Sequence, residues 1–342
     1  MRMTTQWVGA LGMALVSTLG PGCDGAAAVN KEAVAVVKGG TSNAWWKRFS
    51  VGVADGMRDL GLKASMVQSA TSGDVPGQIA LVEGLINRKV PAIIVDPDGD
   101  PTLMEPTLQK ARAAGILVLT HEVPDQVNKD WDVETIDNTK FAQQHFDKLT
   151  TYMGTSGKYA VFTGGSALHA YWANAGIDYV KKTFPNLVLV RETVGQDFSI
   201  CGEADAMTHP NCGDSLAAIL AAHADLKGLV IFGANGPVTA AAYLKAQANT
   251  SVNLVGVAAP SAIQQYMKEG YMKEAFLWDP RDSAYSLVYI ANELLNKRSI
   301  ATLTIADQGA AVVDSQNHTV TFNKNIDITP ANVDALNAQL GF

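Results

Sequence analysis

The feature that most constrains the fold is a repeated order of apolar strand, polar loop and amphipathic helix. Its first copy spans Ala33–Gly61, where the apolar run Ala33–Val37 precedes a polar loop with two adjacent tryptophans. Apolar side chains then recur every three or four residues, at Trp46, Phe49, Val53, Met57 and Leu60. That spacing predicts one buried face of a helix, which Gly61 ends as a C-cap. Continuous apolar strands joined by such helices are typical of a parallel sheet covered on both faces.

The same order recurs along the chain. After the first strand and helix, the pattern predicts strands at Lys63–Gln68, Pro91–Val95 and Ile116–Thr120, with helices between them. A second series of strands is predicted at Tyr159–Thr163, Leu187–Thr193, Gly228–Phe232, Val252–Val257 and Glu274–Leu277. Helices are predicted near Tyr171–Phe184, Asp214–His223, Val238–Gln247, Ser261–Glu269 and Ser283–Leu295, followed by extended chain over Thr302–Phe322 and a helix over Ile328–Leu340. The chain therefore contains two similar α/β units.

Composition and charge exclude some classes of protein. With 342 residues, 47% of them hydrophobic and 17% charged, the chain can bury a large core, and two domains are expected. The net charge is −7 and the pI is near 5.4, with Lys and Arg scattered singly. This pattern lacks the basic patch of a nucleic-acid-binding protein. No Gly/Ser-rich or Pro-rich linker separates the two units, so we expect a hinge of ordinary strands between them.

The N-terminus has the pattern of an export signal. Arg2 precedes the apolar run Trp7–Leu19, and small residues follow as far as Ala28. The run is too short for the roughly 20 apolar residues that span a bilayer. Two cleavage points remain open for this signal peptide over residues 1–28: before Cys23, as in a lipid-anchored protein, or after Ala28.

The two other cysteines close a short polar loop. Cys201 and Cys212 bound the segment CGEADAMTHPNC, and in an oxidising compartment they predict a disulfide. A metal site formed by these two cysteines with His209 is the alternative, but a structural zinc ion has four ligands, and only three lie together here. Two free thiols are the remaining alternative. We therefore predict no metal and no cofactor.

Polar and aromatic side chains follow the predicted strands. Because parallel strands present their carboxyl ends at one edge of a sheet, these loops are where such sheets bind ligands. Aromatic rings stack on the apolar faces of sugars, and carboxylates and amides bond sugar hydroxyls. The candidate ligand-binding residues are Lys38, Asn43, Trp45, Trp46, Asp96, Glu122, His169, Tyr171, Trp172, Asn235, Trp278 and Asp279.

These loops resemble those of a known family. Asn43-Ala44-Trp45-Trp46 is similar to the Asn-Pro-Phe-Phe pattern of type I periplasmic solute-binding proteins of sugar ABC importers. Glu122 matches the family's ligand-binding aspartate, and Asn235 its asparagine in the second lobe. The resemblance implies a Venus-flytrap fold of two similar doubly wound parallel-sheet lobes joined by a multi-strand hinge. The first lobe is then 32–137 plus 279–304, and the second 138–278 plus 305–342.

Within the family, the chain is most similar to binders of autoinducer-2, rhamnose and polyols. Lys38 resembles their lysine after the first strand, and Phe276–Pro280 resembles their Leu-Trp-Asp segment. Two positions differ. Leu168-His169 stands where the autoinducer-2 receptors have an Asp-Gln dipeptide, and Ala258 stands where ribose-type binders have an aspartate.

Several candidates also have a purely structural interpretation. Trp46 begins the apolar helix face, so it can belong to the core, whereas Trp45 lies off that face. Asp96 and Asp98 have the chemistry of a turn, and Asp279 precedes Pro280 as a helix cap does. Trp172 can pack into the core, His169 can lie at the surface, and Lys38 can pair with Glu122 or Asp279 instead of a ligand.

The residues favour capture of a ligand over catalysis. No dinucleotide, Walker or nucleophile-elbow motif occurs, and only Glu122 with Asp279 offers a glycosidase-like carboxylate pair. A sugar-responsive repressor would carry a DNA-binding helix pair where this chain has its export signal. We therefore predict a monomeric periplasmic binder of a neutral sugar, polyol or autoinducer-2-like ligand that serves a membrane permease and ATPase. A sensor module for a chemoreceptor or another signalling partner is the alternative.

Overall fold

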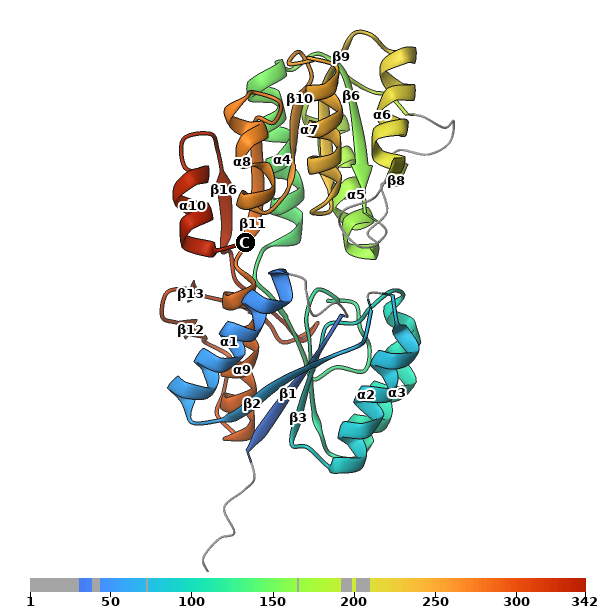
Figure 1. Ribbon diagram of the computed structural model, residues 1–342. Helices are drawn as coiled ribbons and strands as arrows, with labels where there is room; N and C mark the ends of the chain where they lie inside the picture. Colours follow the sequence, from blue (N-terminus) through green and yellow to red (C-terminus); the bar gives the residue numbers. More distant parts are fainter. Residues whose placement is uncertain (1–30, 39–43, 72, 165, 192–198, 201–209) are drawn as a thin grey trace, which may run out of the picture. The chain divides into compact units, whose positions relative to one another are not determined.

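Two sheets organise the chain (Figure 1). The computed structural model describes residues 31–38, 44–71, 73–164, 166–191, 199–200 and 210–342, and Lys31–Phe342 forms one unit. The first sheet comprises β1 (Glu32–Val37), β2 (Lys63–Gln68), β3 (Ala92–Val95), β4 (Leu117–Thr120), β5 (Trp131–Glu134), β14 (Val312–Asp314) and β15 (Thr319–Thr321). Their order is β14-β15-β5-β4-β3-β1-β2, and all but β14 run parallel to their neighbours.

Helices cover both faces of the first sheet. Figure 1 shows α1 (Ala44–Leu60) beside α9 (Pro280–Leu295), and α2 (Val75–Arg88) beside α3 (Glu105–Ala113), which follows the short 3-10 helix η1 (Pro101–Met104). Alternate strand residues fill the two cores: Ala35 and Ile94 pack with α1 and α9, and Val36 and Ile93 with α2 and α3. The apolar runs are continuous because both faces are buried.

Two glycines allow α1 and α9 to pack closely. A Cβ on Gly52 would lie 2.1 Å from the Arg281 carbonyl oxygen, and one on Gly56 would lie 2.7 Å from Val288. Because these glycines are four residues apart, they form one flat stripe along the helix. Met57, predicted to face inward, is 43% exposed, because the contact with α9 turns this part of the helix toward its glycines.

The second sheet has the same doubly wound arrangement. Its strands are β6 (Gly157–Thr163), β7 (Leu187–Leu189), β8 (Ser199–Ile200), β9 (Leu226–Phe232), β10 (Asn253–Val257), β11 (Glu274–Trp278) and β16 (Asn325–Ile328), in the order β16-β11-β10-β9-β6-β7, with β8 also on β6. Around it lie α4 (Asn138–Met153), α5 (Ala167–Thr183), α6 (Pro210–Ala222), α7 (Gly236–Ala246), α8 (Pro260–Lys268) and α10 (Val333–Leu340). A small hairpin, β12 (Thr304–Ile305) and β13 (Gly309–Ala310), completes the described elements.

The chain passes between the two sheets after β5, after β11 and after β15. The third connection runs alongside the first, since Phe322 N donates to Glu134 O at 2.8 Å and Lys324 N donates to Thr135 O at 3.0 Å. The predicted fold, two doubly wound parallel-sheet lobes joined by several strands, is thus confirmed.

Four local expectations differ from the structure. The sequence analysis assigns no strand to residues 131–134 and no helix to 138–153, where β5 and α4 lie. Residues 325–328 form β16, antiparallel to β11. The sequence analysis expects no strand there and begins a helix at Ile328. Residues 312–321, expected in the second lobe, belong to the first sheet instead, where β15 pairs with β5 and β14 with β15. Val320 and Phe322 fill the core of that sheet.

Some predictions fall outside the described residues: the signal peptide over 1–28 with Cys23, the ligand contact of Asn43, and the loop residues Cys201 and His209. The predicted strand over Leu187–Thr193 is observed as the shorter β7.

Candidate functional site

The carboxyl ends of β1, β3, β4 and β5 place several charged side chains together. Strand order reverses direction between β1 and β3, because β2 lies on one side of β1 and β3 to β5 lie on the other. Such a switch point is where open α/β sheets bind ligands. The register pairs Val36 with Val95 and Val95 with Thr120, so the residues that follow each strand lie along one edge. Lys38 and Asp96 therefore flank the switch point.

Lys38, Asp96 and Glu122 form a triad at this edge. Lys38 Nζ lies 3.1 Å from Asp96 Oδ1 and 3.5 Å from Glu122 Oε2. Asp96 is buried, and burial raises its pKa to about 7, while the Lys38 ammonium acts in the opposite direction and the Glu122 carboxylate adds to the rise. One lysine thus serves two carboxyl groups, and the predicted pairing of Lys38 with Glu122 is present.

Glu122 has an unusual backbone conformation. Its φ is +60°, in the left-handed region that costs a non-glycine residue about 1 kcal/mol or more. The neighbouring His121 is buried and bonds Val133 O through Nδ1 at 2.6 Å, and its Nε2 lies 3.7 Å from Glu122 Oε1. This conformation directs the Glu122 carboxylate to the same group of side chains as Lys38 and Asp96.

Asp132 and Glu134 are members of this polar group that the sequence analysis missed. Both are buried on β5, and Thr120 Oγ1 donates to Asp132 Oδ2 at 2.6 Å. Burial raises the pKa of both carboxyls, and for Glu134 the neighbouring Asp132 raises it further. Acidic residues two apart on a strand share a face, and the alternation in Trp131-Asp132-Val133-Glu134 could have revealed the strand. It could not reveal that the polar face is buried.

The Asp96-Pro97-Asp98 loop is held by hydrogen bonds of its own. Asp98 accepts from Gly73 N at 2.6 Å, and the buried Gln78 side chain donates to Asp96 O and accepts from Asp98 N. Asp98 therefore has the structural role that turn chemistry suggested, whereas the Asp96 side chain belongs to the charged triad.

The two adjacent tryptophans differ in environment. Trp46 is 6% exposed and packs in the first core, with its ring 5.6 Å from that of Phe49. Trp45 is partly exposed, and its ring meets those of Trp278 and Phe342 edge-on at 5.2 and 6.0 Å. Of the pair, Trp45 is the more exposed residue.

A second group of candidates lies at the carboxyl ends of β6 and β9, the switch point of the second sheet. The Trp172 ring is fully buried, and its Nε1 donates to Asn138 Oδ1 at 2.8 Å. His169 stacks on that ring at 5.3 Å, and Tyr171 is 47% exposed and bonds Thr139 through its hydroxyl. Trp172 thus belongs to the core of the second lobe, and the imidazole of His169 stacks on its ring.

Asn235 and two glycines complete that edge. Gly164 N donates to Phe232 O at 2.7 Å, and a Cβ on Gly233, whose φ is +110°, would lie 3.0 Å from Gly164 N. This close approach requires glycine at position 233. Asn235 stands at the start of α7, where its side chain makes no cap hydrogen bond to the helix. Asn235 is half-buried and lies two residues after Gly233.

Trp278 and Asp279 lie where the chain leaves β11 for α9. Trp278 is buried, and its ring lies within 6 Å of the rings of Trp45, Trp172 and Phe141.

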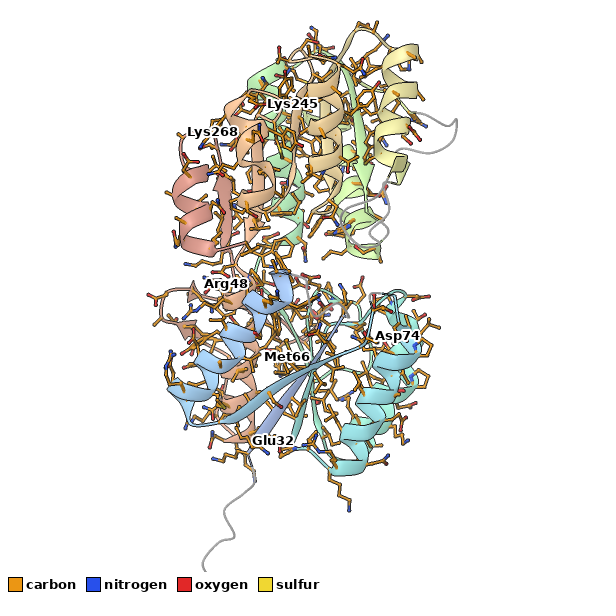
Figure 2. The ribbon with its side chains drawn as sticks, viewed as in Figure 1. Glu32, Arg48, Met66, Asp74, Lys245 and Lys268 are labelled. Atoms are coloured by element: carbon orange, nitrogen blue, oxygen red, sulfur yellow. The ribbon has the colours of Figure 1, made fainter. Side chains whose placement is uncertain are left out.

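Asp279 caps α9, accepting from Arg281 N, and also accepts two hydrogen bonds from Arg48, at 2.9 and 2.7 Å. These bonds to Asp279 raise the pKa of Arg48. Figure 2 labels Arg48 on α1. The Asp279 carboxylate thus accepts hydrogen bonds from residues of both α1 and α9.

Other site classes find no support in the described part of the chain. Among the residues placed there, no group of three or more His, Cys, Asp or Glu side chains could hold a metal ion. No helix in the same ranges is both long and apolar enough for a membrane span. Cys212 is buried at α6, and the predicted disulfide depends on Cys201, outside those ranges.

Known proteins share this architecture. LsrB from Clostridium saccharobutylicum, solved in complex with AI-2, superposes with a TM-score of 0.73 at 18% identity, covering 89% of this chain and 99% of that one. An ABC transporter solute-binding protein from Clostridium phytofermentas with bound L-rhamnose gives 0.72 at 20% identity, covering 92% and 100%. A carbohydrate transporter solute-binding protein from Agrobacterium radiobacter with D-arabinose gives 0.71 at 17% identity, covering 91% and 99%. At these identities the likeness shows the fold.

The sequence itself shows the family. Residues 34–299 match the periplasmic binding protein domain, a span that runs from β1 to beyond α9 and so includes both switch points described above. The chain therefore belongs to the periplasmic binding protein family.

Proposed function

We propose that the protein is the extracytoplasmic solute-binding component of an ABC importer, and that it captures a neutral sugar, polyol or autoinducer-2-like molecule and releases it unaltered. The observation that carries the proposal is the triad at the first switch point. Lys38 lies within 3.5 Å of both Asp96 and Glu122, and all three follow the parallel strands β1, β3 and β4.

The chemistry of this edge suits a ligand without net charge. Lys38 is a donor, Glu122 accepts from hydroxyl groups, and Asp96, whose pKa is raised to about 7, can donate when protonated and accept when ionised. Each hydroxyl of a hydroxyl-rich molecule donates one hydrogen bond and can accept two, so such a molecule can pair with all three side chains. The bound molecules of the structural relatives, L-rhamnose and D-arabinose, belong to this class.

The second switch point supplies the other half of the proposed site. Asn235 offers an amide and His169 an imidazole. From the first lobe, the partly exposed Trp45 on α1 offers a ring on which the apolar face of a sugar can stack. A ligand that contacts both groups favours a closed arrangement of the two lobes by its differential affinity. A membrane permease with its ATPase is the proposed partner that recognises the closed arrangement.

The proposed location follows from the sequence. Residues 1–28 act as the export signal, cut before Cys23, with a lipid anchor there, or after Ala28. The signal directs the protein to the periplasm, an oxidising compartment, where Cys201 and Cys212 form a disulfide. We expect the mature protein to be a monomer without a cofactor.

A thermal-shift screen tests the function. Purified protein is heated with pentoses, hexoses, deoxysugars, polyols and autoinducer-2, one at a time. A ligand at 100 times its Kd stabilises the folded state by about 3 kcal/mol, which raises Tm by several degrees. If no compound of these classes raises Tm, the proposal is wrong.

Glu122→Ala tests the site itself. Loss of the carboxylate leaves ligand hydroxyls without an acceptor, so the thermal shift given by the best compound should vanish. The matched control is Glu269→Ala, which removes an exposed carboxylate paired with Lys245 on the second lobe. An unchanged shift in Glu122→Ala would remove Glu122 from the site.

A further inference from the structure

The chain on the N-terminal side of Glu122 is held by the first sheet. His121 N donates to Val95 O at 3.0 Å, which continues the pairing of β3 with β4. The buried His121 ring also bonds Val133 O through Nδ1 at 2.6 Å. Glu122 follows with a φ of +60°, which a non-glycine residue keeps only where its surroundings require it. The strain at Glu122 therefore needs a second constraint, on its C-terminal side.

A tight turn comes directly after Glu122. Gln126 N donates to Val123 O at 3.0 Å, and Pro124 occupies the second position of the turn, where its fixed φ is favoured. Lys129 is buried, and its ammonium donates to Pro124 O at 2.7 Å and to Gln126 O at 2.8 Å. One ammonium has three protons, so it can bond several carbonyl oxygens at once. Lys129 thus fixes the turn that follows the strained residue.

Glu105, in the first turn of α3, holds the next part of the same loop. Its carboxylate accepts from Val127 N at 2.6 Å, and from the backbone and side-chain nitrogens of Asn128 at 2.9 and 2.7 Å. Hydrogen bonds to a carboxylate are charge-assisted and roughly twice as strong as neutral ones. Asp130 ends the loop, since its N donates to Val118 O and its carboxylate accepts from Val118 N, both at 2.8 Å. The loop is therefore anchored to α3 and to β4 as well as to itself.

We propose that Lys129 and Glu105 are positioning residues that clamp the loop after β4 and so hold Glu122 in its left-handed conformation. This assignment rests on the proposed function for the role of Glu122 as a ligand-binding group. The clamp itself is a property of the ligand-free protein. Burial of an ammonium opposes folding unless its hydrogen bonds compensate, and backbone strain persists only where the surrounding contacts over-determine it. Both conditions are met in this one loop.

The strain at Glu122 sets the size of the expected effect. Without the clamp, the backbone should relax to an ordinary conformation, and the carboxylate would no longer lie 3.5 Å from Lys38 Nζ. The cost of the left-handed region corresponds to a factor of roughly 5 to 30 in the population of a non-glycine residue. Because only the competent conformer binds, the apparent Kd should rise by about the same factor.

Nuclear magnetic resonance of the ligand-free protein tests the clamp. A positive φ, which few non-glycine residues adopt, brings the amide proton of a residue close to its own Hα. Glu122 should therefore give a strong intraresidue Overhauser effect in the wild type. In Lys129→Met, which keeps the apolar stem and removes the donors, this signal should fall to the intensity of residues with negative φ.

A second variant keeps the test decisive if Lys129→Met does not fold. Glu105→Gln preserves the shape of the side chain but turns one accepting oxygen into a donor, so the backbone N–H groups of Val127 and Asn128 can no longer both be satisfied. The Glu122 signal should weaken there too. A weak signal in the wild type, or a strong one in the variant that decides, overturns the proposal.

Lys110→Met is the matched control. Lys110 lies on α3 and pairs with Glu83 at the surface, so its loss should leave the Glu122 signal unchanged. Loss of the signal in this control as well would reveal a general effect of removing a lysine, and would overturn the assignment to Lys129.

Ligand affinity tests the consequence for the site. The probe is L-rhamnose or, if it does not bind, another compound that raises Tm in the thermal-shift screen. Its Kd should rise roughly 5- to 30-fold in Lys129→Met and stay unchanged in Lys110→Met. An unchanged Kd in Lys129→Met would overturn the positioning role. If no compound of the screen binds the wild type, the proposed function fails, while the Glu122 signal still decides whether the clamp exists.

Discussion

Carboxylates that look equivalent in the sequence have different environments in the structure. Asp96 and Glu122 share Lys38 at the edge of the first sheet, whereas Asp279 is held by Arg48 and caps α9. A glycosidase pair of Glu122 and Asp279 is therefore disfavoured, since the second member is bound to a guanidinium. The pKa of Asp96, raised to about 7 by burial, places its change of charge near neutral pH.

The raised pKa of Asp96 predicts a pH-dependent contribution to stability. Its pKa is about 7 in the folded protein against 3.8 when exposed, so its contribution is fully present below pH 3.8 and is lost as pH rises to about 7. Asp96→Asn removes this loss. Relative to the wild type, the variant should gain on the order of 3 kcal/mol of unfolding free energy between pH 4 and pH 7.

Urea unfolding at several pH values measures this difference. Asp100→Asn is the control, because Asp100 is an exposed cap of the following 3-10 helix and its pKa is lowered by its bonds to Thr102. A difference between Asp96→Asn and wild type that stays constant from pH 4 to pH 7 would contradict the assignment of a raised pKa to Asp96.

At the scale of elements, the packing of α1 against α9 determines the position of Trp45, a candidate side chain in the first turn of α1. The stripe of Gly52 and Gly56 lets the helices approach closely, and the bidentate contact of Arg48 with Asp279 lies one turn earlier on α1. Trp45, in the same turn, reaches the Trp278 ring at the end of β11. The position of Trp45 therefore depends on a helix contact rather than on its own loop.

Gly52→Ala tests this contact. The added methyl group would lie 2.1 Å from a backbone oxygen that cannot move away independently, so the variant should lose about 3 kcal/mol or more of unfolding free energy. The control is Gly84→Ala on α2, where no atom lies within 4 Å of the new methyl group. There the higher helix propensity of alanine should stabilise the protein by roughly 0.5–1 kcal/mol. Equal effects of the two variants in urea unfolding would contradict the packing argument.

At the scale of the whole molecule, neither lobe is made from one continuous segment. The first sheet needs β14 and β15 from near the C-terminus, and the second needs β16 and α10, which follow them. Because β16 pairs with β11 and carries Ile328 into the second core, the last residues stabilise the lobe whose main strands lie before residue 279.

Removal of residues 325–342 should therefore affect the two lobes unequally. It deletes Ile328, Val333 and Leu340, all nearly fully buried, and burial of three such side chains is worth about 5 kcal/mol or more. Hydrogen exchange should show lost protection in β9, β10 and β11, while β1, β3 and β4 keep theirs. Equal loss or full retention in both groups of strands would show that this account of the C-terminal segment is wrong.

The sequence by itself determined the fold class. Apolar runs and helical spacings are local signals, and each repeat of strand and helix forces a parallel connection, so the two doubly wound sheets could be predicted. The same reasoning located Lys38, Asp96 and Glu122, because the carboxyl ends of parallel strands share one edge.

Only the tertiary structure decided which polar groups are buried and what they contact. Asp132 and Glu134 alternate with apolar residues as an exposed strand face would, and their burial arises from neighbours distant in sequence. Likewise, nothing local distinguishes Asp279, bound by Arg48, from Glu122, or shows that Asn138 accepts a hydrogen bond from Trp172. Solvation and pairing are set by segments that meet only in the folded chain, so periodicity alone could not predict them.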